Sequence, residues 1–177
     1  LLMSLIFGFE WLFGWIEIKQ FSNFSNTSFI SLLLLVSSLI GFICVGIYEE
    51  MLFRGYLLRN LAEGVNSGSR KALNSLVVAY LISSLIFGLF HILNPNTSWI
   101  STLNIILAGL FLGLGYVLTG ELAIPIGLHI TWNFFQGNVF GFPVSGVDSS
   151  VSLIEIQQNG SVCLTGGAFG PHAGLIG

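Results

Sequence analysis

Long apolar runs separated by short polar stretches dominate the chain. Residues 29–47 contain no charged residue and no proline, and a run of this length is enough to cross a membrane as one helix. Three later runs, residues 73–93, 99–118 and 122–142, are similarly apolar and are joined by short polar connections. The pattern therefore predicts an all-α fold, a polytopic bundle of transmembrane helices.

Both ends of the chain depart from this pattern. Residues 1–18 are apolar and aromatic but include Glu10 and Glu17, which predicts a weaker span or an interfacial helix, so we expect four to five spans. Residues 19–28 are polar and predict a loop, and the glycine-rich residues beyond 143 are expected to be poorly ordered if they lack a partner. The expected divisions are a weak first span and loop at 1–28, the helix bundle at 29–142, and a tail at 143–177.

Composition agrees with a membrane protein. Hydrophobic residues make up 54% of the chain and charged residues 7%, against about 25% charged residues in soluble domains. The net charge is −3 and no basic cluster is present, so we expect the lipid bilayer as a partner and no nucleic acid. The two cysteines form no Cys/His cluster, which disfavours a structural zinc site. Because the chain begins with Leu1, we expect a clipped or partial sequence. The tail is also expected to be truncated.

Basic residues gather in one connection. Arg59, Arg70 and Lys71 follow the first strong span, whereas the connection at 94–98 has no charge. Because cytoplasmic loops carry an excess of lysine and arginine, the 59–72 connection is predicted to be cytoplasmic and the tail to lie on the other side.

The sequence EEMLFRG follows directly on the first strong span. Ionised residues in a membrane cost up to about 2.5–3.5 kcal/mol each, which makes them candidates for a functional site. Glu50 and Arg54 lie about 40° apart around a helix and can form an ion pair. Glu49 lies about 140° from Arg54 and faces elsewhere, so it is free to act as a general base. A charge cluster that anchors a helix end in the lipid headgroups would account for the same residues.

Two later spans contain the polar sequences FGLFH and HITWN. The first ends in His91, and the second places His129 and Asn133 on one helical face. Packing or a helix–helix hydrogen bond would explain each of them separately. If the helices form a bundle, however, Glu49, His91, His129 and Asn133 converge on one polar pocket. A carboxylate base with imidazole and amide donors can activate water and stabilise the oxyanion that forms at a peptide carbonyl.

The three sequences occur in the order of the EExxxR, FxxxH and HxxxN motifs of the CPBP (CAAX protease and bacteriocin-processing, or Abi) family of intramembrane proteases, and the chain resembles this family over residues 29–142. The resemblance implies a multi-pass membrane endopeptidase of a bacterial plasma membrane or a derived organelle membrane. Its substrate would be a peptide or protein, lipidated in the case of CAAX substrates.

The resemblance also implies individual roles. The implied catalytic residues are Glu49 as the base, Glu50 and Arg54 as its support, His91 to position water, and His129 and Asn133 to bind the oxyanion. For this family, both a glutamate mechanism without metal and a metalloprotease mechanism have been proposed. No HExxH sequence is present, which favours activated water, but Glu49, His91 and His129 are candidate ligands for a divalent metal such as zinc. The tail sequence GGAFGPHAG resembles a GGxxGPE loop, with His172 in place of the glutamate, and we expect this histidine to be non-catalytic.

Two other functions fit parts of the sequence. One is a non-proteolytic immunity or scaffold protein of the same family, against which the intact set of Glu49, His91 and His129 argues. The other is a small proton-coupled transporter, in which buried glutamate and histidine would relay protons. The near absence of charge elsewhere in the spans makes transport the weakest of the three hypotheses.

Overall fold

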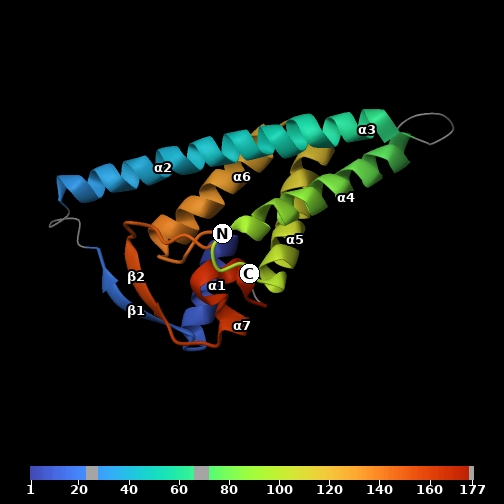
Figure 1. Ribbon diagram of the computed structural model, residues 1–177. Coiled ribbons are helices and arrows are strands. Elements are labelled where there is room, and N and C mark those ends of the chain that lie inside the picture. The colour runs from blue at the N-terminus through green and yellow to red at the C-terminus, as the bar shows by residue number, and fades with distance from the viewer. Residues whose placement is uncertain (23–27, 66–71, 176–177) are drawn as a thin grey trace.

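The computed structural model describes residues 1–22, 28–65 and 72–175, and within them the protein is mostly helical (Figure 1). The α-helices are α1 (Leu2–Leu12), α2 (Phe29–Glu50), α3 (Arg59–Val65), α4 (Ala72–Phe90), α5 (Trp99–Thr119), α6 (Ala123–Phe134) and α7 (Val162–Thr165). Two π-helical segments, η2 (Met51–Leu58) and η4 (Phe135–Val139), and three 3-10 turns, η3 (His91–Leu93), η5 (Gly167–Phe169) and η6 (Pro171–Ala173), complete the helical part. The predicted helix bundle is confirmed.

One continuous helix of 37 residues, Phe29–Val65, forms the longest element and runs along one side of the bundle (Figure 1). Its start is capped by Ser28, whose hydroxyl accepts a hydrogen bond from the Ser31 backbone N–H at 3.1 Å. The π-helical η2 begins directly after the two adjacent glutamates, and π segments widen a helix locally. The helix reaches Val65, and residues 66–71 lie outside the described residues.

The spans predicted at 73–93 and 99–118 are confirmed closely. In the described part of the chain, three helices are long and apolar enough to cross a membrane: Phe29–Val65, Ala72–Leu93 and Trp99–Thr119. The predicted span at 122–142 is shorter, since α6 and η4 end at Val139. The helix α6 packs against both α2 and α5, so protein covers part of its surface.

Small residues set the close packing of α4 on α5. A Cβ atom placed on Gly88 would lie 2.9 Å from the backbone nitrogen of Ile106 and 3.0 Å from the carbonyl oxygen of Thr102. Where lipid surrounds the helices, association depends on such backbone approach rather than on hydrophobic burial, and glycine allows it. On another side of α4, the Ser83 hydroxyl donates to the carbonyl of Phe53 at 2.7 Å, which joins α4 to η2.

A two-stranded antiparallel sheet joins the two ends of the chain. β1 (Ile16–Phe21) pairs with β2 (Ile154–Gln158), with an irregularity between Ile18 and Gln20. The loop predicted at 19–28 is therefore wrong for its first residues, which belong to β1; residues 23–27 lie outside the described residues. The helix α1 has 11 residues, too few to span a membrane, and contributes to an apolar cluster beside β1.

The C-terminal segment, defined here as residues 161–175, folds onto the end of the bundle. We expected this tail to be poorly ordered if it lacked a partner, and the bundle supplies one. Asn104 of α5 donates two hydrogen bonds from its amide, to the carbonyl oxygens of His172 at 2.9 Å and Gly174 at 2.7 Å. Phe169 is buried in a cluster with side chains of η2, α4 and α5. Gly170 has a φ of +98°, and a Cβ atom there would collide with the Pro143 carbonyl, so the glycines that suggested disorder allow tight packing instead.

Candidate active site

A fully buried ion pair lies at the start of η2. Glu50 and Arg54 are 0% and 1% exposed, and the Arg54 Nη1 donates to Glu50 Oε1 at 2.9 Å, as the spacing predicted. The guanidinium also donates from Nη2 to the Gly109 carbonyl at 2.9 Å and lies 4.4 Å from the ring centre of Phe87. These contacts compensate a charge that would otherwise be costly to bury.

Glu50 also fixes a histidine of α6. The Nδ1 atom of His129 lies 2.9 Å from the same Glu50 Oε1 that accepts from Arg54. Since a carboxylate oxygen accepts, Nδ1 carries the proton in this contact. Glu50 therefore connects α2 to α6 and sets the ring orientation of His129, a structural role consistent with the support that the motif implies.

Glu49 faces away from Arg54, also as predicted. Its Oε1 atom accepts a hydrogen bond from the Tyr48 hydroxyl at 2.9 Å, while Oε2 is buried and has no hydrogen-bond partner among the described residues. Oε2 lies 4.0 Å from His91 Nε2 and 3.9 Å from His129 Nε2. These separations exceed a direct hydrogen bond and are of the size that a bridging water spans.

The three facing atoms are all hydrogen-bond acceptors when the imidazoles are neutral. The Nδ1 atom of His91 lies 2.8 Å from the Phe87 carbonyl oxygen, which can only accept, so Nδ1 donates there. His129 uses its Nδ1 toward Glu50 in the same way. Each Nε2 then presents a lone pair toward Glu49 Oε2. A water molecule between these atoms can donate to two of them, which is the arrangement that a general base and a water-positioning residue require.

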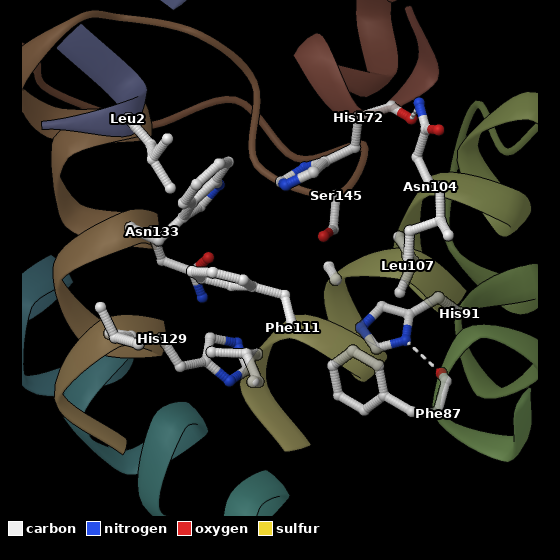
Figure 2. Close-up of a pocket in the computed structure, with 15 residues that line it drawn as sticks. Leu2, Phe87, His91, Asn104, Leu107, Phe111, His129, Asn133, Ser145 and His172 are labelled. Carbon is white, nitrogen blue, oxygen red and sulfur yellow. Dashed lines mark hydrogen bonds between the residues drawn. The ribbon is translucent and has the colours of Figure 1, made fainter. Parts of the chain in front are cut away.

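A cavity of about 260 Å³ adjoins this cluster (Figure 2). His91, His129 and Asn133 line it together, and the last two are 8% exposed. Glu49 is not among its lining residues and lies behind the two imidazoles. Most of the remaining wall is apolar and comes from α5 and α6: Ile105, Leu107, Ala108, Phe111, Leu112, Leu128 and Trp132.

The structure thus brings together every residue predicted for the site. Several polar residues at the site were not predicted, among them Tyr48, Asn104 and Ser145. Tyr48 donates to Glu49 but carries no signal beyond its position next to the glutamates. His172, which we expected to be non-catalytic, enters the same cavity from the C-terminal segment (Figure 2). Its isolated position in a glycine-rich stretch gave no sign of this contact.

The candidate metal ligands can be tested against the geometry of zinc. A tetrahedral zinc with bonds of about 2.0–2.1 Å brings its ligand atoms within roughly 3.3 Å of one another. The Glu49 Oε2 atom is 3.9–4.0 Å from the two Nε2 atoms, and among the described residues no group of three His, Cys, Asp or Glu side chains is arranged to hold a metal ion. The two separations from Glu49 Oε2 are therefore longer than those between two ligands of one tetrahedral zinc.

Comparison with known proteins agrees with the motifs. Residues 30–135 match the family model described as type II CAAX prenyl endopeptidase Rce1-like. No curated protein and no solved structure matches the chain. The matched region covers more than half of the chain and contains all six residues predicted for the site. With its three helices able to cross a membrane, the chain is an integral membrane protein. It belongs to the type II CAAX prenyl endopeptidase Rce1-like family.

Proposed function

We propose that the protein is an intramembrane endopeptidase that hydrolyses peptide bonds of membrane-associated substrates with water activated by Glu49. The observation that carries this proposal is the buried, unpartnered Oε2 of Glu49, which faces the Nε2 atoms of His91 and His129 at 4.0 and 3.9 Å. Glu10 and Glu50 also have a buried Oε2 without a partner among the described residues, so what distinguishes Glu49 is the pair of histidine nitrogens that faces this oxygen at the distance a bridging water spans. Here the missing donor is a water molecule.

In the first step, a water molecule between Glu49 and His91 donates one hydrogen bond to each of them. Glu49 Oε2 takes a proton as the water oxygen forms its bond to the peptide carbonyl carbon, and the carbonyl electron pair moves onto oxygen. The amide of Asn133 donates to this oxyanion. His129 can donate to the oxyanion only when Nε2 carries a proton as well as Nδ1, so in this step it offers no lone pair and the water is held by Glu49 and His91 alone.

In the second step, the oxyanion collapses and the carbon–nitrogen bond breaks. Glu49 returns its proton to the leaving nitrogen, so one water and one peptide bond yield a carboxylic acid and an amine. Glu50 and Arg54 contact neither the water nor the substrate in this scheme. They hold His129 in place, because Glu50 Oε1 accepts from both His129 and Arg54 at 2.9 Å.

The wall of the cavity supports a membrane-associated substrate. Apolar side chains such as Leu107, Phe111 and Leu128 make up most of it, and they favour an apolar chain or a lipid group next to the scissile bond. We expect the protein to act as a multi-pass enzyme of a bacterial plasma membrane or a derived organelle membrane, with a peptide or protein substrate that carries a lipid in some cases.

The test compares wild type with Glu49→Gln in detergent against a library of membrane-adjacent peptides, with cleavage scored by mass spectrometry. Glu63→Gln is the matched control, since this glutamate lies on the same helix and its side chain is 66% exposed. Loss of a general base lowers the rate about 10²- to 10⁴-fold, so we expect cleavage by wild type and the control only. Cleavage by Glu49→Gln at the wild-type rate would refute the role of the base.

Two further results would redirect the proposal. If folded wild type cuts no peptide, a non-proteolytic immunity or scaffold role within the family becomes the better explanation. A chelator added to the wild-type reaction tests the metal, and we expect cleavage to continue because the two separations from Glu49 Oε2 are longer than those between two zinc ligands. Loss of cleavage that zinc restores would show that Glu49, His91 and His129 close around a metal.

A further inference from the structure

A third imidazole enters the cavity from the C-terminal segment. His172 lies in η6 and is 8% exposed. Its ring stacks on Trp132 of α6, with ring centres 5.6 Å apart and planes inclined by 27°. Figure 2 shows the ring directed into the cavity, on the side away from His129.

The position of this ring is held by its neighbours. Trp132 donates from Nε1 to Gln136 Oε1 at 2.8 Å, and Gln136 in turn donates from Nε2 to the Pro143 carbonyl at 2.6 Å. The backbone oxygen of His172 accepts from Asn104 at 2.9 Å. The imidazole is therefore placed by contacts to its backbone and to its stacking partner, so its nitrogens remain available for other groups.

One of these nitrogens has an unsatisfied hydrogen-bonding capacity. Nδ1 of His172 is buried and has no hydrogen-bond partner among the described residues. A buried polar atom without a partner is costly and needs an explanation, and the cavity that His172 lines offers space for a molecule that could supply one. The mechanism proposed above uses His91, His129 and Asn133 and leaves His172 without a task.

The surroundings define what such a molecule would be. Burial, together with the nearby His91 and His129, lowers the pKa of His172 to about 4, so at neutral pH its ring is uncharged and has one donor and one acceptor. No Lys, Arg, Asp or Glu is present among the described residues that line the cavity. An uncharged donor–acceptor group in an apolar wall complements a peptide unit and not a carboxylate or an ammonium group.

We propose that His172 is a substrate-binding residue, whose imidazole hydrogen bonds to the backbone of an uncharged, apolar peptide segment that occupies the cavity. This inference rests on the proposed function, because it assigns the cavity to a peptide substrate. The C-terminal segment then serves as one wall of the substrate site, opposite the histidines that act on the scissile bond.

The test measures binding without cleavage, in the Glu49→Gln background of the full chain in detergent. The probe is a fluorescein-labelled octapeptide of alternating leucine and alanine, and its partner is the same peptide with ester links in place of amides. His172→Phe keeps the flat ring against Trp132 and removes both nitrogens. Leu175→Ala is the matched control, since this exposed side chain lies on the same segment.

Loss of one neutral hydrogen bond weakens binding about 2- to 12-fold. We expect this loss for His172→Phe with the amide peptide, much less with the ester peptide, and no change for Leu175→Ala. His172→Gln, which retains a donor and an acceptor, should bind the amide peptide better than His172→Phe does. In the active enzyme, His172→Phe should raise KM by a similar factor and leave kcat near its wild-type value.

The inference is overturned if wild type binds neither peptide, or if His172→Phe binds both peptides as wild type does. It is also overturned if His172→Phe loses binding of both peptides equally and unfolds at a lower temperature, because that combination marks a purely structural role. Failure of the proposed function gives a different pattern. Binding that depends on His172 without any cleavage by wild type would refute the endopeptidase and keep this binding site. Cleavage by wild type, together with an unchanged KM in His172→Phe, would keep the endopeptidase and refute this binding site.

Discussion

Two ion pairs on the same long helix have nearly the same geometry and opposite burial. Arg54 Nη1 lies 2.9 Å from Glu50 Oε1, and Arg59 Nε lies 3.1 Å from Glu63 Oε1, each pair being four residues apart. The first pair is 1% and 0% exposed, whereas the second is 69% and 66% exposed. Replacing each glutamate by glutamine removes one negative charge in both cases. In the buried case the same oxygen also accepts from His129, so the two variants compare a buried charge network with an exposed pair.

The expected magnitudes differ about tenfold. Breaking a buried pair by removing one partner costs about 3–5 kcal/mol, because the remaining charge is left uncompensated. In Glu50→Gln the Arg54 guanidinium keeps the Gly109 carbonyl and the ring of Phe87, but it loses the adjacent carboxylate charge that compensates its own. An exposed pair four residues apart on a helix contributes about 0.3–0.5 kcal/mol.

The assay is thermal unfolding of both variants in the same detergent, followed by the helical circular dichroism signal. At about 2–4 °C per kcal/mol for a chain of this length, Glu50→Gln should unfold about 6–20 °C below wild type and Glu63→Gln within about 2 °C of it. The double variant Glu50→Gln with Arg54→Met should recover most of the loss, since the buried charge is removed. Equal unfolding temperatures for Glu50→Gln and Glu63→Gln would refute the reasoning.

Three other perturbations test the packing and the two ends of the chain. Gly88→Ala should lower stability by about 1–3 kcal/mol, because the added Cβ would crowd the Ile106 backbone nitrogen. Its control is Gly41→Ala, where a Cβ would meet nothing within 4 Å, so the unfolding temperature should stay unchanged or rise slightly. Asn104→Ala removes two hydrogen bonds to the C-terminal segment, about 1–3 kcal/mol together, and should speed proteolysis there; unchanged proteolysis would contradict this role. In α1, which is too short to span the membrane, burial raises the pKa of Glu10 from 4.5 to about 7. The folded protein then holds a proton that the unfolded chain releases, so stability is highest below pH 4.5 and falls until about pH 7, by on the order of 1–3 kcal/mol. Glu10→Gln should remove this slope when unfolding temperatures at pH 5 and pH 8 are compared.

The sequence was sufficient to place α4 and α5 and to select the six motif residues that the fold brings together. An apolar run bounded by polar residues can satisfy its backbone in a membrane only as a helix, so the positions of α4 and α5 follow from hydropathy alone. Helical spacing is also a local property. It placed Arg54 beside Glu50 and directed Glu49 away from Arg54. The motifs then indicated the family, which the match over residues 30–135 confirms.

The contacts between distant segments could not be read from the sequence. The pairing of β1 with β2 joins residues more than one hundred positions apart, and the glycine-rich tail reads as disorder until α5 supplies Asn104 as its partner. The same holds for His172, whose cavity exists only after residues from α1, α4, α5, α6 and η6 meet. Local pattern fixes which residues are helical and which are chemically active. Only the packed structure decides which side chains share a space, because that depends on backbone approach between helices and on hydrogen bonds across long separations.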